Sequence, residues 1–128
     1  MRLRTKLEIV SACVVVPCAL ELLSAKRSFA WLSRISAGGE SVAPSLLAFN
    51  VDRILHRAPW IWRHSCLRRA AVLAYLLRRG GRDASVVIGV RRSGEGALEA
   101  HAWLACDGVD PFLEPSDSIG TFQPLGRA

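Results

Sequence analysis

The chain has 128 residues, of which 51% are hydrophobic and 22% are charged. This length supports one hydrophobic core and argues against a multidomain enzyme, and the composition excludes a disordered chain. The net charge of +6 is uneven: residues 1–50 carry +3, residues 51–92 carry +8 and residues 93–128 carry −5. The basic excess, which alone would suggest nucleic acid or membrane, therefore describes a dipolar chain.

The N-terminal third is predicted to be helical. An apolar run of 12 residues from Ile9 to Leu20 follows three basic residues and contains Pro17. A membrane-spanning helix needs about 20 apolar residues, and glutamates at both ends of the run argue against a signal peptide, so we expect a buried helix. Residues 26–35 mix basic and apolar side chains, which favours a helix packed on the domain and leaves peripheral membrane contact open.

Residues 36–44 are rich in Gly, Ser and Pro and predict a loop. This loop separates an N-terminal helical region, residues 1–44, from a core, residues 45–128, within a single domain. Apolar residues at helical spacing predict two further helices, one over 45–57 and one from about Ser65, a good N-cap, to Gly80.

Alternation and β-branched residues predict three strands, over residues 84–90, 98–106 and 109–114. The Asp107-Gly108 pair is a strong signal for a two-residue hairpin turn between the last two. The predicted fold class is therefore α+β, with N-terminal helices followed by an antiparallel sheet.

Cysteine and histidine spacing argues against disulfides and zinc. The four cysteines and three histidines are scattered, without the Cys-x-x-Cys or His-x-x-x-His pairs of a metal site. We therefore expect reduced thiols, no metal and no cofactor, in a cytoplasmic protein.

Cys66 is the first candidate for a nucleophile. It opens a predicted helix, where unpaired backbone N–H groups and the positive end of the helix dipole favour a thiolate, and arginines at 63, 68 and 69 act in the same direction. A thiolate nucleophile needs an imidazole to protonate the leaving group. The alternative is that Cys66 is a small buried hydrophobic residue in an Ala/Leu-rich helix.

His101 is the candidate base, because it lies on a predicted strand between two alanines. Alternation puts Trp103 on its face and turns Cys106 away. The alternatives are that His101 is a satisfied core histidine, or that the base is His64, whose geometry relative to the thiol is undefined.

An acid behind the imidazole would complete a triad. If residues 107 and 108 form a two-residue turn, the residue opposite His101 is Glu114, with Cβ atoms about 5 Å apart. Asp110 is the reserve acid, because it shares that face but lies roughly 13 Å along the strand from His101. A longer turn would move the position opposite His101 to Pro115 or Ser116.

Five motifs then occur in order: Cys-Leu-Arg-Arg-Ala at 66–70, Leu-Leu-Arg-Arg-Gly at 76–80, Val-Ile-Gly-Val-Arg at 87–91, Ala-His-Ala-Trp at 100–103 and Asp-Gly at 107–108. Together they resemble the transglutaminase-like cysteine peptidases of lasso peptide biosynthesis, the B2 or leader-peptidase component, over about half the chain. The resemblance implies a transglutaminase-like, papain-like core and a triad of Cys66, His101 and a downstream acid. Family members usually carry Asp near this place, whereas the hairpin register selects Glu114.

The resemblance implies a function in bacterial antibiotic biosynthesis: removal of the leader from a ribosomally made lasso precursor (a RiPP), through a thioester. The implied partners are the precursor's leader region, a separate leader-recognition protein of the B1 type and a lasso cyclase of the C type. The recognition protein is expected to be separate because the roughly 50 residues before the match are too few for such a domain. The oxyanion and substrate-binding candidates are the Cys66 backbone N–H and the side chains of Trp62, Trp103 and Arg63.

Two other functions remain open from the sequence. The same triad supports acyl transfer or cross-linking, as in transglutaminases, when an amine replaces water. A non-catalytic basic module would instead bind nucleic acid or anionic membrane, but the chain lacks the aromatic-basic pattern of single-strand binders, and no nucleic-acid partner is expected.

Overall fold

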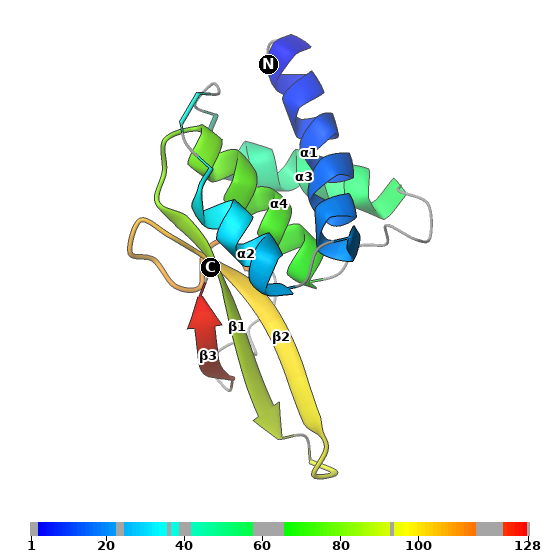
Figure 1. The fold of residues 1–128 in the computed structure, drawn as a ribbon, viewed down its shortest axis with the longest axis vertical. Coiled ribbons are helices and arrows are strands. Elements are labelled where there is room, and N and C mark those ends of the chain that lie inside the picture. The colour runs from blue at the N-terminus through cyan, green and yellow to red at the C-terminus, as the bar shows by residue number, and fades with distance from the viewer. Residues whose placement is uncertain are drawn as a thin grey trace.

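The computed structural model describes residues 3–22, 25–35, 37–38, 42–57, 66–92, 94–114 and 122–127. Within these ranges four helices precede a three-stranded antiparallel sheet (Figure 1). The elements are α1 (Leu3–Leu22), α2 (Ala25–Ser33), α3 (Pro44–Arg57), α4 (Cys66–Arg79), β1 (Ala84–Arg92), β2 (Leu98–Cys106) and β3 (Gln123–Arg127). The predicted α+β class, helices first and sheet second, is confirmed.

Helix α4 ends where the paired glycines predict. Gly81 has a positive φ of 87°, its N–H donates to Arg78 O at 3.0 Å, and the Arg82 N–H donates to Leu77 O at 2.9 Å. These two bonds form a Schellman cap, which satisfies carbonyls that the helix end would leave unpaired. The cap turns the chain directly into β1, so the helix and the first strand are tightly connected.

The main core lies between the helices and one face of the sheet. Helix α4 packs against α1, α3 and both long strands, and most of its side chains are buried. From β2, the side chains that enter this core are those of Ala102, Leu104 and Cys106. The other face of the sheet carries a separate small cluster of Val87, Trp103 and Ala105, with Phe122 packed against it.

Strand β1 is the centre of the sheet, with β2 on one side and β3 on the other. The β1–β2 register places Gly89 opposite His101 and Val87 opposite Trp103. Strand β3 pairs with β1, so the third strand of the sheet comes from residues 123–127.

The prediction of a third strand over residues 109–114 is wrong. The two-residue turn forms as expected, with Cys106 bridged to Val109, and both turn residues have the positive φ of a type I′ hairpin, 50° at Asp107 and 82° at Gly108. Beyond this pair the ladder stops, because Pro111 has no N–H to donate and Leu113 adopts a left-handed backbone with φ of 54°. Phe112 still donates its N–H to Leu104 O at 2.7 Å, which keeps the segment beside β2.

The β1–β2 hairpin extends away from the helices (Figure 1). Burial along β2 follows this shape: Leu98 and Ala100 are exposed, whereas every residue from Ala102 to Cys106 is buried. His101 lies at the boundary between these two halves.

Helix α1 is buried on one face only. Ile9, Val16 and their neighbours enter the core, as predicted. The outer face is also apolar, with exposed side chains of Leu3, Leu7, Val10, Val14 and Val15. None of the helices in the described ranges is long and apolar enough to cross a membrane.

Candidate active site

Cys66 is the first residue of α4. Its thiol is free and partly buried, and the side chain packs against the main core. At this position it lies beside helix N–H groups that have no intrahelical partner, as the sequence predicts. The expected N-cap Ser65, the rival base His64 and the substrate-binding candidates Trp62 and Arg63 lie outside the described residues.

His101 and Glu114 are in contact. The His101 Nε2 and Glu114 Oε2 atoms are 3.5 Å apart, and the Glu114 side chain is 8% exposed against 23% for His101. This is an ion-pair distance without hydrogen-bond alignment: Nε2 is buried, and no hydrogen bond to it forms within the described part of the chain. Because Nε2 faces Glu114, Nδ1 is the ring nitrogen that can exchange a proton with a substrate or a thiol.

The chain reaches this contact by an unexpected route. The hairpin register that selects Glu114 is correct at the turn, where Cys106 and Val109 exchange hydrogen bonds of 2.9 and 3.0 Å. The residues that follow leave the ladder but continue along β2, so Glu114 still arrives at His101. The length of the segment, rather than continuous strand pairing, brings the acid to the base.

Aromatic rings surround the imidazole. The His101 ring stacks on Trp103 with centroids 6.3 Å apart and lies 5.4 Å from the Phe122 ring. The cross-strand partner Gly89 provides the necessary space, because a Cβ atom there would lie 2.6 Å from the Trp103 ring. Small size at position 89 and large rings at 103 and 122 thus limit the orientations of the imidazole.

Trp103 has a structural role, which corrects its selection as a substrate-binding candidate. Its side chain belongs to the buried cluster behind the sheet and is 3% exposed. Its indole N–H donates to Asp110 Oδ1 at 2.5 Å, so this N–H is already used. The reserve acid Asp110 therefore binds the Trp103 indole, and the acid next to His101 is Glu114.

Arg69 is also used differently from the sequence prediction. Its side chain is almost fully buried; Nε donates to Asp52 Oδ1 at 2.8 Å, and the terminal NH2 group donates to Leu113 O at 2.9 Å. The Asp52 carboxylate balances this charge, so Arg69 is not a free cation beside the thiol. Sequence reasoning missed Asp52, because no spacing rule connects residues 17 positions apart on different helices.

The structure brings two of the three proposed triad members, His101 and Glu114, into contact. Helix α4 packs on the face of the sheet that carries Ala102 and Leu104, whereas His101 shares the opposite face with Trp103. Within the described residues, no hydrogen bond joins the Cys66 thiol to the imidazole. His101 and Glu114 thus form a pair that belongs to the sheet, whereas the thiol belongs to the helical layer.

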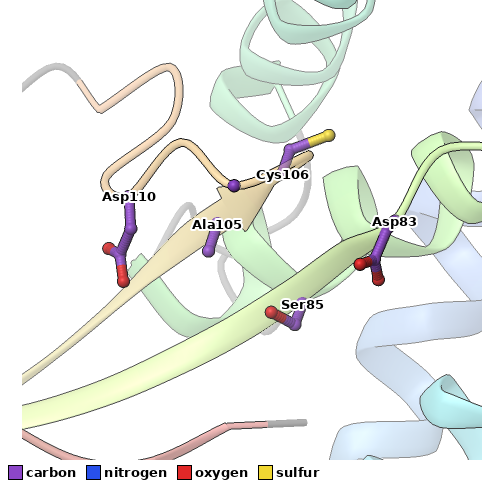
Figure 2. Close-up of a pocket in the computed structure, with 6 residues that line it drawn as sticks. Asp83, Ser85, Ala105, Cys106 and Asp110 are labelled. Carbon is purple, nitrogen blue, oxygen red and sulfur yellow. The ribbon is translucent and has the colours of Figure 1, made fainter.

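A pocket of about 190 Å³ lies elsewhere, beside the Asp107-Gly108 turn, where β1 begins and β2 ends (Figure 2). Its lining residues are Asp83, Ser85, Ala105, Cys106, Gly108 and Asp110. The Cys106 side chain points away from those of Ala105 and Asp110 (Figure 2). Burial, and secondarily the Asp107 carboxylate, raises the pKa of the Cys106 thiol to about 11, which makes it a poor nucleophile at neutral pH. Among the described residues, no group of three or more His, Cys, Asp or Glu side chains could hold a metal ion.

One family model matches the chain. The family model described as Transglutaminase-like superfamily matches residues 12–127, almost the whole chain. No curated protein and no solved structure matches the chain significantly. Members of the superfamily are generally cysteine peptidases and acyltransferases. A cysteine that begins a helix, followed by a strand histidine backed by an acid, is consistent with that chemistry, and by its match over residues 12–127 the chain belongs to the transglutaminase-like superfamily.

Proposed function

We propose that this protein is a cysteine endopeptidase that removes the leader from a lasso peptide precursor. The observation that carries the proposal is the 3.5 Å contact between His101 Nε2 and the buried Glu114 carboxylate. A buried acid on one nitrogen of a partly exposed imidazole is the arrangement that orients a general base. Cys66, at the start of the neighbouring helix, supplies the thiol.

The reaction has two steps. The Cys66 thiolate attacks the scissile carbonyl, and His101 protonates the departing amine of the core peptide as the bond to the leader breaks. His101 then takes a proton from water, which hydrolyses the thioester and releases the leader as a carboxylic acid. Glu114 orients the imidazole and balances its charge in both steps. The Cys66 backbone N–H, at the helix start, is one donor for the oxyanion.

This mechanism requires the thiol and the imidazole to meet in the substrate complex. Catalytic hydrogen bonds are often long in ligand-free enzymes and shorten when substrate binds. His101 is suited to such an adjustment, because it lies where the projecting half of β2 joins the buried half.

The leader specificity is supported by the motifs around Cys66 and His101, which resemble those of lasso leader peptidases. On this proposal the protein works in the cytoplasm with a separate recognition protein that binds the leader, and its product passes to a cyclase. The Arg-rich span 53–92, apart from the arginines that form ion pairs within the protein (Arg69, Arg79, Arg82 and Arg91), gives acidic residues of the leader or of the recognition protein a complementary charge.

The first experiment incubates the protein with a lasso precursor and its recognition protein and detects released leader by mass spectrometry. Cys66→Ala should abolish cleavage. Cys18→Ala is the matched control, because Cys18 is also a free, partly buried thiol but lies on α1, and it should cleave normally. Equal cleavage by the Cys66→Ala protein would overturn the mechanism.

The second experiment separates the two acids. Glu114→Gln keeps the shape of the side chain but removes the charge beside His101, and it should slow turnover about 10-fold or more. Asp110→Asn keeps an acceptor for the Trp103 indole and should leave turnover nearly unchanged. The reverse result would assign the triad acid to Asp110.

Acyl transfer is distinguished by the product. Acid-quenched reactions should contain a thioester on Cys66, formed as the core amine leaves. In the presence of an added primary amine, a peptidase releases the leader mainly as the free acid, whereas an acyltransferase releases it mainly as the amide. A predominant amide would replace the hydrolytic proposal with the acyl-transfer alternative.

A further inference from the structure

The buried guanidinium of Arg69 connects three parts of the molecule. Arg69 lies on α4, three residues after Cys66, and is only 7% exposed. Its Nε atom binds Asp52 on α3 at 2.8 Å, and its terminal NH2 binds the backbone carbonyl of Leu113 at 2.9 Å. One side chain thus ties the helix of the thiol both to α3 and to the segment after the hairpin.

The Leu113 carbonyl is one peptide unit from the acid of the pair. Leu113 has a φ of 54°, a backbone conformation that L residues other than Asn and Asp rarely adopt, so the surrounding structure must hold it there. The hydrogen bond from Arg69 is such a restraint. Its loss would release the backbone that carries Glu114, whose carboxylate lies 3.5 Å from His101 Nε2.

We propose that Arg69 is a positioning residue for the acid of the triad, with Asp52 fixing the guanidinium. It acts through the Leu113 backbone on Glu114, and through Glu114 on His101, without touching substrate. Because Arg69 and Cys66 share the first turn of α4, the same side chain keeps the acid-bearing segment in register with the thiol. This inference rests on the proposed peptidase function.

The fork of the guanidinium explains why arginine is needed. Two of its nitrogens point in different directions and bind the carboxylate and the carbonyl at once, whereas the single ammonium of lysine is a compact point charge at the end of a flexible stem. Arg69→Lys therefore keeps the buried charge beside Asp52 but should lose the bond to Leu113. It is a better test than a neutral variant, which would remove the buried ion pair with Asp52 and risk misfolding.

The experiment compares precursor cleavage by the wild-type, Arg69→Lys, Glu114→Gln and double-variant proteins, with recognition protein present. Arg69→Lys should lower kcat roughly 10- to 100-fold, as displacements of about 1 Å do, and leave KM within about 2-fold. In the Glu114→Gln background, Arg69→Lys should lower kcat by less than about 2-fold, because its effect passes through Glu114. Arg79→Lys is the matched control. Arg79 lies at the other end of α4 and pairs with Glu8 of α1, so this variant should keep full kcat.

Circular dichroism and thermal unfolding establish that each variant is folded, and hydrogen exchange of the amides at 112–114 gives a readout independent of activity. Faster exchange there in Arg69→Lys, but not in Arg79→Lys, supports the proposal. Two results overturn it: a kcat unchanged by Arg69→Lys, or losses that add fully in the double variant. Failure of the proposed function is distinguishable, because Cys66→Ala would then cleave as well as the wild type.

Discussion

The two faces of strand β2 differ in what they do. On the face toward the helices, the side chains of Ala102, Leu104 and Cys106 are small or apolar and fill the main core. On the opposite face, His101 and Trp103 carry ring nitrogens, each directed to a carboxylate. The alternation of a strand thus separates packing from chemistry over neighbouring residues, so substitutions one position apart should have effects of different kinds.

The largest effect expected from this comparison is on catalysis. His101→Ala should reduce precursor cleavage by about 10²- to 10⁴-fold, the usual contribution of a general acid–base. Its melting temperature should stay close to that of the wild type, because the side chain is 23% exposed and lies outside the main core. Cleavage by mass spectrometry and thermal unfolding measure the two quantities on the same sample. A large loss of stability with retained cleavage would remove the distinction between the faces.

The opposite pattern is expected three residues away. Leu104→Ala should destabilise the fold by about 2–5 kcal/mol, because Leu104 is fully buried and its truncation leaves a cavity. Cleavage per folded molecule should change little at temperatures where the variant remains folded. Denaturant unfolding, with the folded fraction used to correct the cleavage rate, tests this expectation.

A smaller effect is expected at Gly89, the partner of His101 across the hairpin. Gly89→Ala places a Cβ atom 2.6 Å from the Trp103 ring, so the ring must move, at a cost of about 1–3 kcal/mol. Gly94→Ala is the matched control, because a Cβ atom at that position meets no atom within 4 Å. Tryptophan fluorescence and the melting temperature should change in the first variant and not in the second.

The smallest effect concerns the thiols. Burial raises the pKa of Cys13 and of Cys106 to about 11, so both should resist alkylation at pH 8. The partly buried Cys18 and Cys66 should react first, giving two rapid equivalents in the native protein and four in denaturant. Rapid labelling of Cys106, identified by peptide mapping, would contradict the burial of this face.

The same two thiols affect stability at alkaline pH. Their pKa rises from 9.0 to about 11 on folding, so the unfolded chain loses these protons at lower pH. Stability should therefore decrease as the pH rises from about 9 to 11 and should not change through this cause at neutral pH. The stability of the Cys106→Ala variant should decrease less than that of the wild type over that pH range, as measured by thermal unfolding at several pH values.

Local signals in the sequence predicted the elements that depend on local rules. The glycine cap of α4, the bounds 98–106 of β2 and the Asp107-Gly108 turn were predicted correctly, because each depends on a few adjacent residues. Strand β3 was not predicted, since Gln123-Pro-Leu-Gly-Arg lacks β-branched alternation and forms only by pairing with distant β1.

The site shows the same division. Glu114 could be placed against His101 because the turn sets the register and the number of residues sets the reach, even though the expected strand is absent. The contacts of Arg69 with Asp52 and Leu113 bridge elements that are remote in sequence. No periodicity encodes such contacts, so only the folded arrangement reveals them.

The long hairpin has a consequence for motion. Strand β2 passes from exposed residues to fully buried ones within its nine positions, so its free energy of local opening should rise steeply along its length. His101 lies at the step in this gradient. The base can therefore follow small openings of the outer hairpin while the side chains of Ala102 and Leu104 stay buried in the main core.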